Sequence, residues 1–316
     1  MRTLRLMVCL PLLFVAFCAS AQIKKDSTSA ERPKGTIETR EWFKRKGTFF
    51  FYWGYSRDMF SNSDIRFWGD GYNFKITDVR ALDEPDPISK EYIGLTSFTV
   101  PEYNYRVGYY LSDKVYVSFG EDHMKYHIVP QTTHLTGSIS KEANGTAQIG
   151  TYNNQEVLVG EGSDNNMGAS IIQALPQGFV QGFEHCDGLN DASFEIGRLE
   201  QIWMSKNGKD ALSVVGGVGA GLVVPDTDAD VLGYPPKHDM ATGKKSYHLA
   251  GYSGSLHIGL QFDFCKHFFL LAKLKSGYIN LPDILTTTTG GKASQHFTFI
   301  EGQLVLAYTF SFKKHK

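Results

Sequence analysis

Two residues with catalytic potential, Ser255 and His257, stand two positions apart in the C-terminal third of the chain. Side chains two positions apart share one face of a β-strand, so a hydroxyl and a base would both point to the same side there. Nucleophilic catalysis also needs a third group that orients the base, and no acidic partner is evident. We therefore expect no catalytic residue at this pair and no enzyme activity.

Two short runs contain residue types that bind metals, Glu121-Asp122-His123 and Glu184-His185-Cys186-Asp187. Neither run has an established ligand spacing for zinc. Hydrogen-bonded clusters at a strand end are the better interpretation, and we expect no metal site. Metal binding by either run is the alternative.

Three acidic residues alternate at Asp226, Asp228 and Asp230, which raises the question of calcium. An EF-hand loop needs Gly at its sixth and Glu at its twelfth position, and Val231 and Lys237 stand there instead. A solvated acidic loop is expected, with irregular calcium binding as the alternative. The glycine-rich run 216–221 is followed by no helix, so it predicts no nucleotide site, and no cofactor is expected.

Eight segments alternate apolar and polar residues with the period of a β-strand. They cover residues 48–56, 103–111, 115–122, 194–203, 212–222, 255–264, 270–278 and 301–312. The clearest sets Leu256, Ile258 and Leu260 against Ser255, His257 and Gln261. In the fourth segment, Arg198 and Glu200 break the pattern, and a bulge would explain the break.

The connections between these segments alternate short and long. The short ones are 112–114, 205–210 and 265–267, and the long ones are about 58–100, 130–190, 225–245 and 282–295. Tight turns at one mouth and long loops at the other are typical of an outer-membrane β-barrel. We predict an all-β fold, an eight-stranded antiparallel transmembrane β-barrel with β-hairpins in long extracellular loops. A soluble sandwich or lipocalin-like barrel, which would bury similar apolar stripes, is the alternative.

The N-terminus predicts secretion. Arg2 and Arg5 precede an apolar run, residues 6–17, and Ala19-Ser20-Ala21 forms a small-x-small cleavage site. Phe17 before Cys18 disfavours a lipoprotein signal. We therefore expect a signal peptide at 1–21, a periplasmic lead at 22–45 and an outer-membrane barrel at 46–316.

Composition agrees with this class. The mean hydropathy of −0.24 is too low for a helical membrane protein, whereas alternation hides the apolar face of a barrel. Loss of the two signal arginines moves the formal charge from −1 to about −3, which gives no indication of a nucleic-acid partner. Cys186 and Cys265 survive cleavage, but the predicted topology places them at opposite mouths, too far apart for a disulfide.

The polar faces of the segments carry charges that must be paired if they lie in a barrel lumen. Antiparallel register places Arg106 beside Asp122, and Lys275 beside Glu301. The predicted interior polar network consists of Arg106, Asp122, His257, Lys273, Lys275, Glu301 and Gln303. An eight-stranded barrel is wide enough only for its own side chains or one small ligand, so we expect a polar plug. A narrow ion path or a proton-linked gate is the alternative.

Two long connections carry hairpin signals. In the first, residues 63–76 alternate around Gly69-Asp70-Gly71. In the second, residues 147–159 predict a hairpin that turns at Tyr152-Asn153-Asn154. Both loops are expected to be ordered.

Four phrases give the chain a family likeness: residues 52–57 (YWGYSR), 69–74 (GDGYNF), 122–126 (DHMKY) and 277–283 (GYINLPD). They resemble an uncharacterised outer-membrane β-barrel family of Gram-negative bacteria, similar in architecture to small eight-stranded OmpA/OmpX-type barrels. The resemblance covers most of the mature chain and implies a fold and the cell outer membrane, but no activity. We expect no peptidoglycan-binding domain after Phe312, which would be a departure from the OmpA pattern.

Two functions remain open. The first is a structural or surface-interaction barrel, with outer-membrane lipids around it and an extracellular partner that meets its loops. The second is a narrow channel or small-ligand transporter. A lipid-modifying outer-membrane enzyme is weaker, because Ser255 and His257 are expected to face the lumen, away from lipid.

Overall fold

The computed structural model describes residues 45–84, 101–143, 149–160, 178–208, 210–237, 245–265 and 267–312, without the side chains of residues 186, 187 and 265. The expected signal peptide, nearly all of the expected lead and the last four residues lie outside this part of the chain. The side chains of Cys186 and Cys265, which are expected to form no disulfide, also lie outside the described part. No helix in the described ranges combines the length and hydropathy needed to cross a bilayer.

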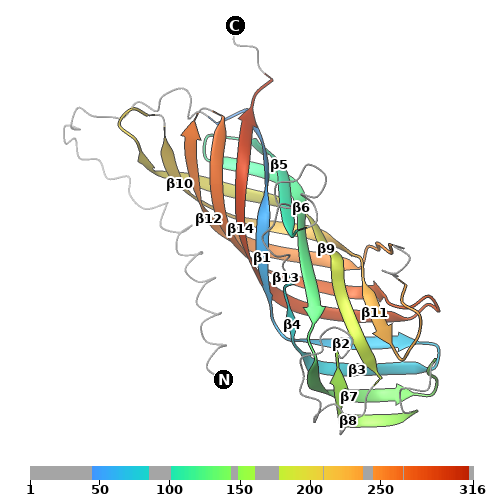
Figure 1. Ribbon diagram of the computed structural model, residues 1–316. Coiled ribbons are helices and arrows are strands. Elements are labelled where there is room, and N and C mark those ends of the chain that lie inside the picture. The colour runs from blue at the N-terminus through green and yellow to red at the C-terminus, as the bar shows by residue number, and fades with distance from the viewer. Residues whose placement is uncertain are drawn as a thin grey trace, which may run out of the picture. The chain divides into compact units, whose positions relative to one another are not determined.

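Eight strands close into an antiparallel barrel, in which each strand pairs with the next and the last pairs with the first (Figure 1). The strands are β1 (Phe49–Phe60), β5 (Tyr103–Tyr110), β6 (Val115–Ile128), β9 (Val180–Met204), β10 (Ala211–Pro225), β12 (Gly251–Cys265), β13 (Phe268–Leu285) and β14 (Lys292–Phe310). This closure confirms the predicted eight-stranded barrel. The full β1–β14 ladder leaves no open edge between the first and last strands.

A belt of exposed apolar side chains surrounds the barrel. On β12, Leu256, Ile258 and Leu260 point outward, while His257 and Gln261 point inward and are buried. The same alternation holds on the neighbouring strands, where exposed residues include Phe51, Val107, Phe119, Ile196, Val218, Leu274, Leu304 and Leu306. An apolar belt on a closed barrel is the surface that a lipid bilayer requires. The chain is an outer-membrane β-barrel, and the two faces predicted for the segment that forms β12 are confirmed.

Three strands are much longer than the segments predicted from the sequence: β9 has 25 residues, β14 has 19 and β13 has 18. A tilted membrane strand needs only about 9–11 residues, so these strands continue beyond the belt. The predicted long connection at 282–295 is therefore wrong, because β13 and β14 pair almost to its middle, as far as Leu285 and Lys292.

The continuing strands carry a second layer of structure at the end of the barrel away from Phe49 and Phe310, here called the distal extension. It adds β2 (Ser63–Gly69), β3 (Tyr72–Val79), β7 (Gln131–Ile139) and β8 (Gly150–Val159), which form a sheet attached to β14 through β2 (Figure 1). Two short strands complete it: β4 (Ala81–Leu82) pairs with β6, and β11 (Asp228–Val231) pairs with β9.

The β2–β3 pair confirms the hairpin predicted at 63–76. The hairpin predicted within 147–159 is wrong, since β8 is one strand and pairs with β7. Asn154 has a positive φ of 56° and donates its backbone N–H to Thr136 Oγ1. Two residues of β8 oppose one of β7 at that point, so the Asn153-Asn154 signal marks a bulge rather than a turn.

The bulge expected in the fourth segment is confirmed, although it lies beyond Glu200. Gln201 and Trp203 pair with consecutive residues of β10, which leaves Ile202 as the extra residue. Arg198 and Glu200 stay on the outer face, where the Arg198 guanidinium bonds the Glu200 carboxylate and Lys114 Nζ lies 2.7 Å from it.

An apolar core fills the distal extension. It includes Ile65, Phe67, Phe74, Ile76, Leu135, Val157, Phe183 and Ile279. His185 is buried beside this core, where its Nδ1 lies 2.8 Å from Thr227 Oγ1. Burial lowers the pKa of His185 to about 4, so its ring is neutral near pH 7.

Candidate functional site in the barrel lumen

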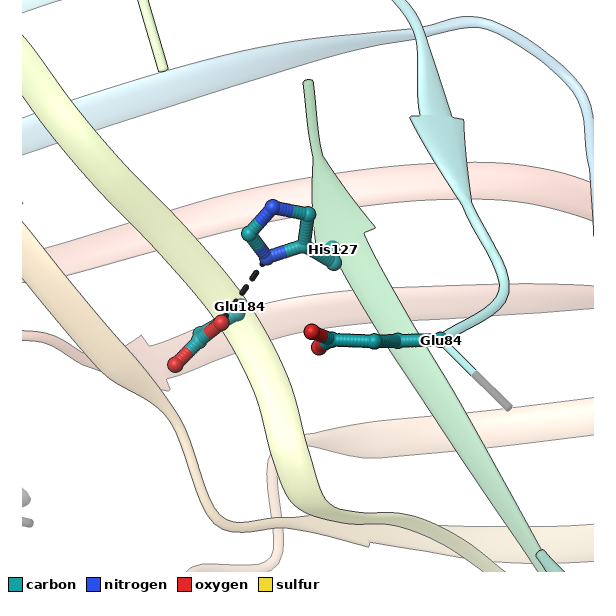
Figure 2. A group of neighbouring side chains, drawn as sticks. All are labelled: Glu84, His127 and Glu184. Carbon is teal, nitrogen blue, oxygen red and sulfur yellow. Dashed lines mark hydrogen bonds and ion pairs between the residues drawn. The ribbon is translucent and has the colours of Figure 1, made fainter. Parts of the chain in front are cut away.

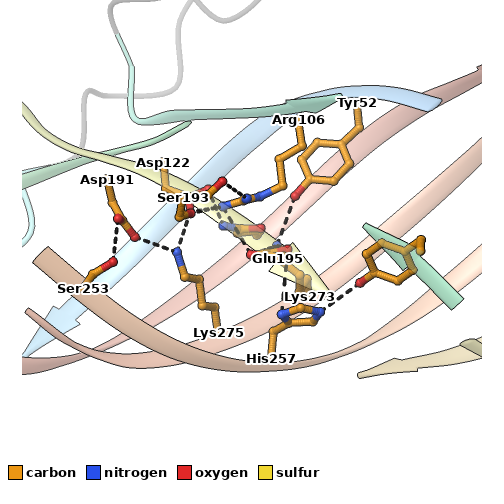
Figure 3. A network of polar contacts seen from close by, with 12 residues as sticks. Tyr52, Arg106, Asp122, Asp191, Ser193, Glu195, Ser253, His257, Lys273 and Lys275 are labelled. Carbon is orange, nitrogen blue, oxygen red and sulfur yellow. Dashed lines mark hydrogen bonds and ion pairs between the residues drawn. The ribbon is translucent and has the colours of Figure 1, made fainter. Parts of the chain in front are cut away.

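The interior of the barrel is layered. At the end of the barrel where β1 begins and β14 ends, apolar and aromatic side chains form a proximal cluster of Phe50, Tyr52, Tyr110, Tyr116, Leu199, Val215, Phe269, Leu271, Val305 and Ala307. The apolar core of the distal extension closes the other end. Between them lies a polar layer, which holds most of the residues predicted for the interior network (Figure 3).

Asp122, on β6, is the first centre of the polar layer. Arg106 on β5 donates to its Oδ2 at 2.6 Å, and Lys275 on β13 donates to the same oxygen at 2.5 Å. Gln303 on β14 donates to Oδ1 at 3.0 Å. One carboxylate therefore connects four strands, and it is completely buried.

Glu195, on β9, is the second centre. Lys273 Nζ lies 3.2 Å from its Oε1, and Arg106 Nη2 is also 3.2 Å from that atom. His257 adds a contact of 3.8 Å from Nδ1, and its Nε2 lies 2.9 Å from the Tyr116 hydroxyl. Lys273 also donates to the Tyr52 hydroxyl at 3.0 Å, so this centre joins the polar layer to the proximal cluster.

A third carboxylate, Asp191, completes the layer. Its Oδ2 accepts from Lys275 at 3.0 Å and its Oδ1 accepts from the Ser253 hydroxyl at 2.6 Å. Arg106 reaches the same strand, because its guanidinium donates to both the hydroxyl and the carbonyl oxygen of Ser193. Three cations therefore face three carboxylates, and such pairing is what buried charges need.

β10 contributes space rather than side chains. A Cβ added to Gly221 would lie 2.1 Å from Asp191 Oδ1, and one added to Gly217 would lie 2.7 Å from the His257 ring. Glycine is therefore required where the network reaches the wall. This agrees with a crowding role for the run 216–221 rather than a nucleotide loop.

Of the two neighbouring charge pairs predicted from the register, one forms an ion pair and the other does not. Arg106 pairs with Asp122, and His257 stands opposite Lys275 in the ladder. Lys275 and Glu301 are register partners as predicted, but the predicted ion pair between them is wrong. Lys275 Nζ bonds Asp122 and Asp191 instead, and neither carboxylate oxygen of Glu301 has a hydrogen-bond partner among the described residues.

Three members of the polar layer, Asp191, Ser193 and Glu195, were not predicted from the sequence, although they share the inward face of β9. Their alternation is a usable signal, but the predicted segment begins at 194, so Asp191 and Ser193 lie in a predicted loop. The proximal cluster was also not predicted, because Phe50, Phe269 and Leu271 are apolar on the face expected to be polar.

The Ser255–His257 pair faces the lumen, as expected. Both side chains are buried, and the bond from His257 Nε2 leads to Tyr116 rather than to Ser255. The pair therefore has no contact with the lipid face.

The two runs that contain metal-binding residue types, 121–123 and 184–187, do not gather their described side chains at one place, because successive side chains of a strand point to opposite faces. Glu121 accepts from the Tyr103 hydroxyl, Asp122 lies in the lumen and His123 contacts Asn190. In the second run, Glu184 lies 2.8 Å from His127 while His185 turns into the core.

The three alternating aspartates are not in a plain loop. Asp228 and Asp230 belong to β11, and Asp226 is buried and accepts the backbone N–H of Ser246.

No protein-family model matches the sequence, and no curated protein matches it either. Among solved structures, Ail, the attachment invasion locus protein of Yersinia pestis, is similar over 84% of this chain and 99% of its own, with 11% identity and a TM-score of 0.28. The outer membrane protein OprG from Pseudomonas aeruginosa is similar over 84% of this chain and 97% of its own, with 11% identity and a TM-score of 0.34. Neisserial surface protein A is similar over 84% of this chain and 98% of its own, with 9% identity and a TM-score of 0.33. The fold assignment itself rests on the strand pairing of this chain.

Proposed function

We propose that this protein is a non-conducting outer-membrane barrel that holds an ordered β-sheet at the cell surface, where the sheet meets an extracellular partner. The observation that carries the proposal is the filling of the lumen by three successive layers. A role in transport would need a continuous path through all of them. The chain instead devotes its long connections to the distal extension.

The polar layer opposes opening, because its bonds run across the lumen. Asp122 and Lys275 come from strands on opposite sides of the eight-stranded ring. An ion that passed would have to separate buried charges from their partners, and each separation leaves an uncompensated charge in a medium of low dielectric.

Apolar layers on both sides strengthen the closure. Phe50 contacts Tyr116 and Phe269 at ring distances of 5.7 and 6.1 Å across the proximal end. Distally, the Lys275 ammonium lies 5.5 Å from the Phe299 ring, which belongs to the core of the extension. Desolvated aromatic layers leave a hydrated ion without polar contacts.

The sheet of the distal extension has the two faces that a display surface needs. Its inner face buries Ile76, Leu135 and Val157, whereas its outer face exposes Lys75, His134 and Glu156. The apolar face fixes the sheet on the barrel and the polar face is available to solvent. An extracellular partner would meet this face.

Two reconstitution experiments test the proposal. Proteoliposomes carrying the protein should show no swelling with small sugars, while an open porin in matched vesicles should. Fluorescent proteoliposomes should also bind components of a glycan and matrix-protein array. A triple variant of the outer face, Lys75→Ala, His134→Ala and Glu156→Ala, should lose that binding and remain heat-modifiable on gels. Swelling with wild-type protein, or binding unchanged by the triple variant, would contradict the proposal.

A further inference from the structure

Three side chains from separate parts of the chain converge on the outer surface of the distal extension. Glu84, His127 and Glu184 each offer a ligand atom, and these atoms all lie within 4.8 Å of one another. Figure 2 shows the two carboxylates and the imidazole pointing toward a shared centre. His127 Nδ1 and Glu184 Oε2 are already 2.8 Å apart.

Strand pairing explains why these residues meet. His127 on β6 stands opposite Leu82 of β4 on one side and opposite Glu184 of β9 on the other. Glu84 follows β4 by two residues, so its long side chain reaches back along the same face. Asp228 of β11 stands opposite Glu184 in turn, and cross-strand partners share a face. The register therefore gathers an imidazole and several carboxylates at one place.

The donor set identifies the class of ligand. Imidazole nitrogen with carboxylate oxygen is typical of zinc and its neighbours in the first transition row, whereas calcium and magnesium take oxygen donors alone. Zinc bonds of about 2.0–2.2 Å to such atoms would hold tetrahedral ligand atoms about 3.4 Å apart. Glu84, His127 and Glu184 need only small side-chain movements to reach that spacing.

Partial exposure suits a metal that enters from solvent. The side chains of His127 and Glu184 are 12% and 20% exposed, and Glu84 is exposed. The site is therefore held by two side chains on paired strands and completed by one that is accessible. Three protein ligands leave a fourth position for water or for a group of another molecule.

We propose that Glu84, His127 and Glu184 bind a divalent transition-metal ion, with zinc as the best fit, on the outer surface of the distal extension. The bound ion connects the segment after β4 to β6 and β9. This site is independent of whether the barrel conducts. It also differs from both sequence runs, because only Glu184 belongs to one of them and its partners are more than 50 residues away in the chain.

Cobalt(II) and zinc titrations of the refolded, untagged full mature chain test the proposal. Wild-type protein should give the visible absorption bands of a low-symmetry cobalt site, and zinc should abolish them at one equivalent. X-ray absorption of the zinc form should show only nitrogen and oxygen neighbours, at about 2.0–2.1 Å. Loss of a partner outside the ligand shell already weakens metal affinity about 10–100-fold, so Glu84→Gln and His127→Gln should each weaken zinc binding at least about tenfold.

A second histidine–glutamate pair of the distal extension supplies the matched control. His134 stands opposite Glu156 on β7 and β8, and both are exposed. His134→Gln and Glu156→Gln should leave zinc affinity unchanged. Glu84→Gln changes one exposed side chain outside any strand, so its folding can be verified by heat modifiability. The proposal would be overturned by the absence of the cobalt bands in wild-type protein, or by equal zinc affinity in wild-type and folded Glu84→Gln protein.

Discussion

Lys275 of β13 and Asp122 of β6 form an ion pair across the barrel, with Nζ and Oδ2 2.5 Å apart, although the ladder places Lys275 directly beside Glu301. In the closed order of eight strands, β6 and β13 stand opposite each other. The lysine side chain therefore crosses the lumen rather than pairing along the wall. This contact couples the two halves of the barrel.

The first prediction compares two pairs: the cross-lumen pair of Lys275 with Asp122, and the register pair of Lys275 with Glu301. Lys275→Met leaves Asp122 and Asp191 without their shared cation, and breaking a buried pair typically costs about 3–5 kcal/mol. The double variant Lys275→Met/Asp122→Asn should recover part of that loss. Urea unfolding in lipid vesicles measures the coupling as a double-mutant cycle.

Glu301→Gln is the control for that cycle, since neither carboxylate oxygen of Glu301 meets the geometric criteria for a hydrogen bond with a described residue. Its coupling to Lys275→Met should be clearly smaller than that of Asp122→Asn. A larger coupling to Glu301 would show that the register pair, and not the cross-lumen pair, is formed in the membrane.

The second prediction concerns the space that β10 leaves for the network. Gly221→Ala places a methyl group against Asp191, where an added Cβ comes within 2.1 Å of Oδ1. We expect a loss of about 1–3 kcal/mol in the free energy of unfolding, as for other overpacked interiors. Gly254→Ala is the matched change, because no atom lies within 4 Å of the Cβ position there. Equal stabilities of the two variants would count against a tightly filled lumen.

The third prediction tests where the bilayer lies on the barrel, by comparing arginine substitutions at two depths on β12. Ile258 is at the middle of β12 and 50% exposed, whereas Tyr252 is exposed near the distal end of the same strand. Arginine on the lipid face costs about 2–4 kcal/mol at the midplane and about 0–1 kcal/mol near the interface. Ile258→Arg should therefore reduce stability in vesicles more than Tyr252→Arg. A reversed order would place the bilayer elsewhere on the barrel.

The fourth prediction fixes orientation. Lys141 is exposed at the distal end of β7, and Asn207 is exposed in the turn between β9 and β10 at the opposite mouth. In a background without the native cysteines, Lys141→Cys should react with a membrane-impermeant maleimide on intact cells. Asn207→Cys should react only after the outer membrane is permeabilised. The inverse labelling pattern would mean that the distal extension faces the periplasm.

Local pattern was sufficient to predict much of the barrel. Alternation with a period of two predicted the facing of Ile258 and His257, and a short turn predicted the contact between Arg106 and Asp122, since these two residues lie on strands joined by that turn. Both inferences depend only on neighbours along the chain or across one hairpin.

Contacts across the lumen could not be predicted in this way. Whether Lys275 reaches Asp122 or Glu301 depends on the tilt and stagger of all eight strands, which no single strand encodes. The same holds for Glu84, His127 and Glu184, which three separate segments bring together. At Asn154, the local sequence predicts a turn, but pairing with β7 makes the same residues a bulge.

Single-channel recording in planar bilayers tests the central claim, a lumen closed by its own side chains, most directly. Wild-type protein should insert without producing discrete current steps, in a bilayer where an open porin gives them. A variant that removes material from all three layers, Phe50→Ala with Lys275→Ala, Asp122→Ala and Phe299→Ala, should produce conductance if it still folds as a heat-modifiable barrel. Reproducible current steps from the wild-type protein would contradict the account.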